Sequence, residues 1–194
     1  MHLRWMRQLS FAQGGTRLAF EDAYALVVFL QARRDQLDAD IEQMALNSSF
    51  TPIVRRLCCL RGIATLTGFG LAVEIGDWAR FTPGSVGAFV GLAPGEASSG
   101  DKRVVTAITK AGNTHARRLL IEAAWHHKKP YRPGEALMSR WNHAPGPVVA
   151  AAHQGNKRLH RRWQAFDTRN KKPVIANTAI ARELAGWCQT LATL

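Results

Sequence analysis

A run of mostly apolar side chains, spaced alternately three and four residues apart, constrains the fold of this chain most. The run comprises Phe20, Ala23, Val27, Leu30, Arg34, Leu37, Ile41 and Met44. This spacing predicts one long amphipathic helix whose seam is typical of a coiled coil or a helical hairpin. Gly14, Gly15 and Thr16 can begin the helix, and residues 47–49 can end it.

The partner of this helix is left open by the sequence. Arg34 interrupts the seam, and about three heptads are marginal for an independent coiled coil. The helix therefore pairs with another chain or folds onto its own domain. The carboxylates between the seam positions, such as Asp35, Asp38 and Glu42, are interpreted as a solvated face.

Basic residues are concentrated in one part of the chain. The formal net charge is +12, and residues 101–172 hold 16 of the 26 Lys and Arg but only 4 of the 14 Asp and Glu. Such a local excess is expected of a surface that lies along a polyanion, because counterion release drives that binding. The alternative is a merely solvated basic surface.

Composition also excludes several classes of protein. Hydrophobic residues make up 46% of the sequence, yet no apolar run is long enough to cross a bilayer and the N-terminus lacks the apolar segment of a secretory signal. We therefore expect a folded protein in the cytoplasm and not in a membrane. Cys58, Cys59 and Cys188 have no C-x-x-C spacing, so they are expected to be reduced packing residues.

Two short helices with a tight turn are predicted after the long helix. Thr51-Pro52 opens a helix through Leu60, residues 61–64 form the turn, and a second helix runs from Thr65 to Ile75. This arrangement resembles a helix-hairpin-helix motif, in which turn amides near Gly62 hold a DNA phosphate. Ala64 and Gly68 depart from that motif, so an ordinary αα-hairpin explains the segment nearly as well.

The remaining sequence completes a mostly α fold. The predicted elements are a helix from Thr82-Pro83 to Val90, a short strand over Val104–Ile108, a helix from Asn113 or Thr114 to His127, and helices over 146–169 and from Asn177 to the end. Three domains are predicted: a coiled-coil connector (1–50), a region with the hairpin and a serine loop (51–133), and a basic helical extension (134–194).

The serine loop carries the candidate chemistry. Ser98 and Ser99 precede Gly100, and such a tripeptide is usually only a turn. Here basic and neutral donors surround it, and they suit the stabilisation of a phosphate and its transition state. The donors in this region are Lys102, Arg103, Lys110, Gly112, Asn113, His115, Arg117 and Arg118. A second basic group on the penultimate helix comprises Lys157, Arg158, Arg161 and Arg162.

Other candidate residues favour structural roles. Adjacent His126 and His127 point in different directions on a helix and are interpreted as a solvated helix end. Five tryptophans are interpreted as core residues or as residues whose polar edge reaches the surface, namely Trp78, Trp125, Trp141, Trp163 and Trp187, although Trp163 can stack on a base. The carboxylates are dispersed, so no two-metal nuclease site is expected and no metal ligands are assigned.

Several ordered motifs together resemble the C-terminal domain of transposases of the insertion sequence 110 family, also called bridge-RNA-guided serine recombinases. The motifs lie at 60–63, 72–77, 80–81, 91–94, 98–100, 108–113 and 117–124. The resemblance is dense over 57–125 and extends more weakly to Leu194.

The resemblance implies a serine that attacks a DNA phosphate and forms a covalent phosphoserine, in a composite site completed by carboxylates of another protomer. Ser99 is the matching nucleophile and Ser98 the second choice. By the same resemblance, Gly100, Lys110, Gly112, Asn113 and the arginine pair of the 117–124 motif shape or contact the phosphate. The implied partners are DNA, a structured guide RNA, and a second copy in a dimer or tetramer joined through the long helix, and the implied location is with the nucleoid.

Members of that family also carry an N-terminal RuvC-like domain whose DEDD carboxylates bind magnesium. This sequence begins just before the connector, so we expect a truncated transposase that binds nucleic acid, holds no cofactor itself and does not recombine DNA alone. A non-catalytic helix-hairpin-helix module that only binds nucleic acid is the first alternative. An all-α adaptor that assembles through the long helix is the second.

Overall fold

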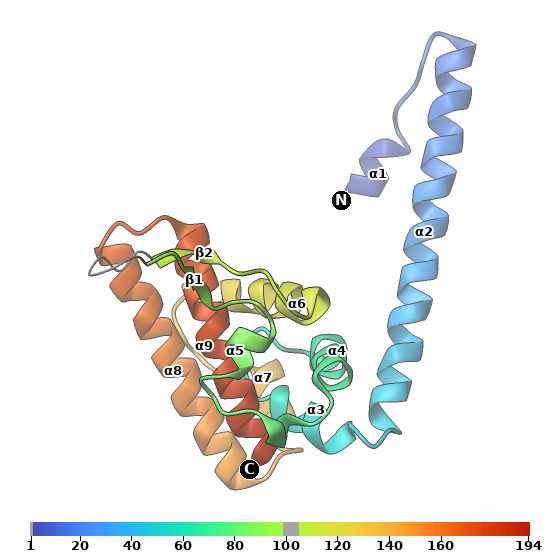
Figure 1. Ribbon diagram of the computed structural model, residues 1–194. Coiled ribbons are helices and arrows are strands. Elements are labelled where there is room, and N and C mark those ends of the chain that lie inside the picture. The colour runs from blue at the N-terminus through green and yellow to red at the C-terminus, as the bar shows by residue number, and fades with distance from the viewer. Residues whose placement is uncertain (1, 99–104) are drawn as a thin grey trace. The chain divides into compact units, whose positions relative to one another are not determined.

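The computed structural model describes residues 2–98 and 105–194 and is built mainly from helices (Figure 1). In chain order its elements are α1 (His2–Met6), α2 (Gly14–Leu46), α3 (Thr51–Leu57), α4 (Thr65–Ile75), the 3₁₀ helix η1 (Trp78–Arg80), α5 (Val86–Phe89), β1 (Pro94–Glu96), β2 (Val105–Ile108), α6 (Thr114–Ala124), the 3₁₀ helix η2 (Trp125–Lys128), α7 (Glu135–Trp141), α8 (Gly146–Thr168) and α9 (Pro173–Thr193). The predicted mostly α fold is confirmed. The chain divides into two compact units, Met1–Gln43 and Met44–Leu194.

The first unit confirms the long helix predicted from the alternating spacing. Helix α2 is 33 residues long. Near its start, the Phe20 ring packs between those of Phe11 and Tyr24, with ring centroids 4.9 Å and 6.0 Å away. Further along the seam the side chains are open to solvent, since Leu30 is 54% and Leu37 43% exposed. The apolar stripe is thus present on α2, and pairing through it stays a prediction.

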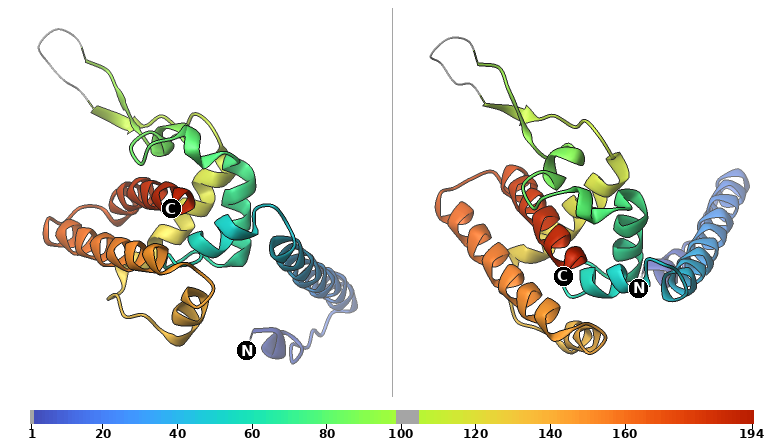
Figure 2. Two further views of the ribbon diagram at one scale, coloured as in Figure 1. Left: turned by 90° about the horizontal axis from the view of Figure 1, so that it is seen from below. Right: turned by 60° about the horizontal axis from the view of Figure 1, so that its bottom comes forward.

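In the second unit, α9 is the helix around which the others are arranged. It contacts α3, α5, α6 and α8, and it lies between α8 and α6 (Figure 2). Its inner face is apolar and buried, with Ile180, Leu184 and Cys188 inaccessible to solvent, while α8 contributes Leu159 and Trp163 to the same core. The core assignment of Trp163 is therefore confirmed. Residues 51–133 and 134–194 lie together in this one unit.

The helical hairpin α3–α4 packs its turn against the rest of the protein. Gly62 has φ +87°, and a Cβ there would lie 2.4 Å from the carbonyl oxygen of Ala123 in α6. The backbone N–H of Arg61 donates to Asn156 Oδ1 in α8, which is fully buried. The bounds predicted for α4 are confirmed, whereas α3 ends at Leu57 instead of Leu60. The turn is thus held by protein groups on the inside of the unit.

Local side-chain bonds explain one shortened helix. The helix predicted to begin at Thr82-Pro83 is present only as α5, because Thr82 and Ser85 bond to each other's backbone N–H groups and hold a turn before it. The sequence analysis also missed η1, β1, η2 and α7. Helix α8 ends one residue earlier than predicted, and α9 begins at Pro173, four residues before the predicted start.

Two packing predictions have opposite outcomes. Cys58, Cys59 and Cys188 are free and buried as expected, and burial raises the pKa of Cys58 and Cys59 to about 11. The solvated helix end is wrong for His127, which lies in η2 and is inaccessible to solvent. Burial lowers the pKa of His127 to about 3, so the ring is neutral.

Candidate nucleic-acid interface

A two-stranded antiparallel ribbon flanks the stretch of sequence that holds the predicted serine. Strand β1 pairs with β2, with Pro94 opposite Ile108 and Glu96 opposite Val105. Ser98 is exposed just beyond β1, and its hydroxyl donates to a Glu96 carboxylate oxygen at 2.7 Å. Four predicted site residues, Ser99, Gly100, Lys102 and Arg103, lie outside the described residues. Their roles stay predictions.

Two chain segments, residues 89–93 and 109–117, meet where the ribbon leaves the helices, and we call them the ribbon base. Two glycines allow their backbones to pack closely. Gly91 and Gly112 have φ of +71° and +81°. A Cβ on Gly91 would lie 2.0 Å from the Ala111 carbonyl oxygen, and one on Gly112 would lie 1.9 Å from the Phe89 carbonyl oxygen. Only glycine allows both this conformation and this approach. Gly112, predicted to shape the site, thus fixes where the ribbon leaves the helices.

Arg117 holds the ribbon base together from α6. Its Nη1 donates to the carbonyl oxygens of Val90 at 3.0 Å, Lys110 at 3.0 Å and Ala111 at 3.3 Å. These oxygens come from both sides of the loop, so one guanidinium links them. Lys110, which has φ +56°, is exposed beside it. Of these two predicted phosphate contacts, Arg117 is bonded to the protein itself and Lys110 faces solvent.

The N-terminus of α6 carries a polar cluster centred on Glu74 of α4. Asn113 caps α6 by accepting the Ala116 N–H at 2.8 Å, and its Nδ2 donates to Glu74 Oε2 at 2.6 Å. His115 Nδ1 lies 2.7 Å from Glu74 Oε1. Hydrogen bonds from Asn113 and then His115 lower the pKa of Glu74. Both predicted phosphate contacts are therefore engaged with a carboxylate.

Arg118 lies apart from this cluster on the exposed face of α6. Its nearest acidic neighbour is Glu122, one turn further on, with 3.7 Å between Arg118 Nε and a carboxylate oxygen. Both side chains are about two-thirds exposed, so this ion pair is weak. The guanidinium remains accessible to an anion.

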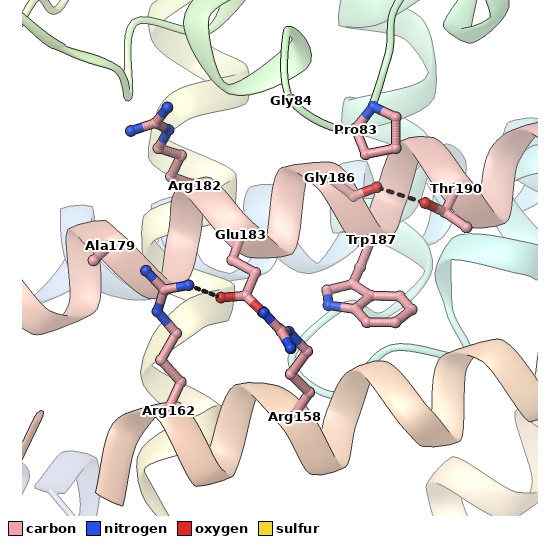
Figure 3. A pocket seen from close by; sticks show the side chains of 10 residues that line it. All are labelled: Pro83, Gly84, Arg158, Arg162, Ala179, Arg182, Glu183, Gly186, Trp187 and Thr190. Carbon is pink, nitrogen blue, oxygen red and sulfur yellow. Dashed lines mark hydrogen bonds and ion pairs between the residues drawn. The ribbon is translucent and has the colours of Figure 1, made fainter. Parts of the chain in front are cut away.

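The second predicted basic group forms a continuous cationic surface with α9. One cavity of about 530 Å³ is lined by Arg158, Arg162, Arg182 and Trp187, among others (Figure 3). An adjacent cavity of about 570 Å³ shares Arg158 and Arg162 and is lined further by Gln154, Lys157 and Arg161. The side chains of α8 that the sequence analysis grouped are therefore brought together by the structure.

A third cavity extends this surface to the ribbon. It has a volume of about 550 Å³, and it shares Arg162 and Arg182 with the first cavity. Its other lining residues include Lys171 and, on the ribbon, Pro94 and residues 105–108. We call these three adjacent cavities the α8–α9 groove. The groove extends from the exposed basic face of α8 to strands β1 and β2.

One carboxylate lies within the groove. Glu183 of α9 accepts a hydrogen bond from Arg158 Nε at 2.6 Å and another from Arg162 Nη1, one on each oxygen. Its side chain is 14% exposed, whereas those of Arg158 and Arg162 are 64% and 43% exposed. Figure 3 shows the two arginines reaching up from α8 to Glu183 on α9.

Arg182, Glu183 and Lys171 were missed by the sequence analysis as groove residues. The available signal was the adjacent pair Arg182-Glu183, which supplies the only charged side chains of helix α9. Trp187 lines the same cavity, and its indole packs on Gly155 of α8, where a Cβ would lie 2.7 Å from the ring. Gly155 thus lets the two helices approach beneath the groove.

Metal ligands are not gathered in the part of the chain that the structure describes. No group of three or more His, Cys, Asp or Glu side chains there is placed to hold a metal ion. The magnesium implied by the resemblance does not fit these residues. Nor does any helix among them have the length and apolar character needed to span a bilayer.

Comparisons with known proteins identify relatives of the chain. Residues 54–135 match the model of the family described as Transposase IS116/IS110/IS902 family. The chain is 31% identical over 192 residues to "Putative transposase y4qE" of Sinorhizobium fredii, covering 98% of this chain and 46% of that protein. It is 28% identical over 176 residues to the transposase for insertion sequence element IS1533 of Leptospira borgpetersenii, covering 88% and 50%. The chain thus spans about half the length of these relatives.

Proposed function

Residues 54–135 belong to the IS116/IS110/IS902 transposase family, and from this premise we propose that the chain holds nucleic acid along the α8–α9 groove and delivers a serine to a DNA phosphate. The observation that carries the proposal is the connection between groove and ribbon. Arg162 and Arg182 line the cavity between α8 and α9 and also the cavity against β1 and β2. A backbone bound by these arginines runs toward the ribbon that carries Ser99.

The groove suits a phosphate backbone. Lys157, Arg158, Arg161 and Arg182 are exposed on adjacent turns of two packed helices. Guanidinium groups bind phosphate oxygens through paired N–H donors, and neutralising phosphates releases counterions from the nucleic acid. Contacts of this kind position the backbone and carry no sequence information, which leaves sequence to base pairing with a guide RNA.

The ribbon suits delivery of a nucleophile. The ribbon base is fixed by two close backbone approaches and by Arg117, so the strands leave the helical body in a set direction. In the proposed step Ser99 Oγ forms a bond to phosphorus while one bond from phosphorus to a sugar oxygen breaks. The serine loses a proton and the leaving oxygen gains one, so the step is balanced.

Cations near the loop stabilise the added negative charge of the transition state in this proposal. Lys110 is exposed at the ribbon base, and Lys102 and Arg103 follow the serine in the sequence. Magnesium would supply further charge stabilisation where a carboxylate-rich domain holds it. No step is assigned to the metal here, because the described residues do not gather its ligands.

Assembly through α2 is part of the proposal. The exposed apolar stripe on α2 provides a surface on which a second copy of the chain packs, as side chains such as Leu30 and Leu37 remain open to solvent. Association of two copies also fits a site completed by carboxylates from another protomer.

Covalent capture tests the nucleophile. The chain, supplied with a carboxylate-rich domain of a family transposase, is incubated with a suicide DNA substrate, and the covalent protein–DNA product is counted on a denaturing gel. Ser99→Ala is expected to abolish capture while DNA binding persists, and Ser98→Ala is expected to retain it. Capture that survives Ser99→Ala overturns the assignment. Binding without capture by either wild type or Ser98→Ala favours the non-catalytic binding module.

A further inference from the structure

Glu183 occupies an unusual position in the proposed interface. Among the described residues that line the α8–α9 groove, it is the only one with an acidic side chain. Its two carboxylate oxygens each accept a hydrogen bond from a different arginine of α8, Arg158 and Arg162. A planar anion thus already bridges two guanidinium groups, as phosphate oxygens would.

We propose that Glu183 is an internal competitor for phosphate, which lowers the affinity of the groove for nucleic acid and so limits binding to sites where further contacts are made. The inference rests on the proposed function. Removing the negative charge raises the net charge of the groove by one and frees Arg158 Nε and Arg162 Nη1 for a phosphate.

The burial of Glu183 and its two arginine partners favour strong competition between its carboxylate and a phosphate. Glu183 is 14% exposed, so its charge is less screened by water than that of a surface carboxylate. Arg158 and Arg162 are more exposed and keep other N–H groups directed to solvent. Lys157, Arg161 and Arg182 line the same groove, and the structure gives none of these three an ion pair with a described carboxylate. Glu183 therefore offsets the positive charge of the groove where α8 and α9 face each other.

The test is the salt dependence of binding by Glu183→Gln, which preserves shape and removes charge. Affinity for a fluorescein-labelled duplex DNA is measured by anisotropy across a range of salt concentrations. At about 0.1 M salt the variant is expected to bind about fivefold to tenfold tighter than wild type, with a slope of log K against log salt steeper by about one. Glu135→Gln, an equal charge change at an exposed residue outside the groove, serves as the matched control and is expected to change both values little.

Repeating the substitution in a second protein, which lacks the two arginines, separates competition at these groups from the effect of net charge alone. In a chain carrying Arg158→Gln and Arg162→Gln, Glu183→Gln is expected to lose most of its effect, because the groups for which carboxylate and phosphate compete are gone. The inference is overturned if Glu183→Gln raises the affinity for DNA equally in both backgrounds, or if it does not raise the affinity in the wild-type background. If the wild-type chain binds no DNA under any salt condition, the proposed function fails and this inference with it. If DNA binding depends on Arg158 and Arg162 but is unchanged by Glu183→Gln, the inference is overturned and the proposed function stands.

Discussion

The ribbon base and the α8–α9 groove are both rich in polar and basic side chains, yet they use them in opposite ways. At the ribbon base, Arg117 binds three backbone carbonyls, and Asn113 and His115 bind Glu74. In the groove, Lys157, Arg161 and Arg182 remain exposed. The family resemblance placed phosphate contacts at the ribbon base. The exposed cations of the α8–α9 groove favour the groove as the surface that binds a polyanion.

This difference separates two requirements of a serine that acts on DNA. The nucleophile has to be held in a set direction, which needs close backbone packing and internal hydrogen bonds. The substrate has to be attracted and oriented, which needs cations that are not consumed inside the protein. Substitutions at the ribbon base should therefore change stability most, and substitutions in the groove should change binding most.

The largest effect is expected for Gly112→Ala at the ribbon base. The positive φ of Gly112 and the 1.9 Å approach of a Cβ to the Phe89 carbonyl oxygen force the two loops apart. We expect a loss of about 3 kcal/mol in the free energy of unfolding, measured by urea denaturation. Gly146→Ala is the control, since a Cβ there meets nothing within 4 Å. Equal stability of the two variants would show that the ribbon base is not closely packed.

The second-largest effect is expected from charge reversal in the groove. It should lower the affinity for DNA and leave the free energy of unfolding nearly unchanged. The double variant Lys157→Glu and Arg161→Glu should weaken binding to duplex DNA about a hundredfold at about 0.1 M salt and flatten the salt dependence. Anisotropy titrations measure both. Lys129→Glu with Arg132→Glu makes the same charge change on exposed residues outside the groove. If that control pair weakens binding equally, net charge and not the groove is responsible.

Neighbouring arginines on α6 sharpen the comparison further. Arg117→Met removes the hydrogen bonds to three carbonyls, so we expect the free energy of unfolding to fall by about 2 kcal/mol. Arg118→Met removes only an exposed ion pair with Glu122, which contributes about 0.5 kcal/mol or less. Thermal and urea unfolding of the two variants give the difference. A larger loss at Arg118 would contradict the structural role assigned to Arg117.

The smallest effect is expected from the cluster at the N-terminus of α6. The pKa of Glu74 is lowered in the folded state, so its ionised form stabilises the fold above its unfolded pKa, and this contribution is lost as pH falls through the folded value. The stability advantage of wild type over Glu74→Gln should therefore shrink as the pH falls from above the unfolded pKa of a glutamate, about 4.3, to below it. Urea denaturation across that range measures it. An advantage that grows as pH falls would have the wrong sign for this carboxylate.

Features with strong local signals were predicted from the sequence. The spacing of apolar residues predicted α2, and the turn at residues 61–64 predicted where α4 begins. Asn113, which caps α6, was one of the two caps predicted for that helix. The basic residues of α8 were also predicted as one group. In each case the determining interactions lie within a few residues along the chain.

Features set by distant partners were not predicted. Strand β1 contains Pro94 and Gly95, which disfavour a strand, and its pairing partner β2 supplies the reason that it forms. Burial of His127 depends on the helices packed over η2. Glu183 and Arg182 become groove residues only because α9 lies against α8, a contact between segments that no local pattern in α9 specifies.

Photocrosslinking to DNA tests the central claim, that nucleic acid lies in the α8–α9 groove, most directly. A photoreactive amino acid replaces Gln154, a neutral exposed residue that lines the groove, and in a second protein it replaces Met138, which is exposed on α7 and lines none of the three cavities. After irradiation with labelled DNA, we predict a crosslinked product from position 154 and little from position 138. Equal yields from both positions, or a product from position 138 alone, would contradict the account.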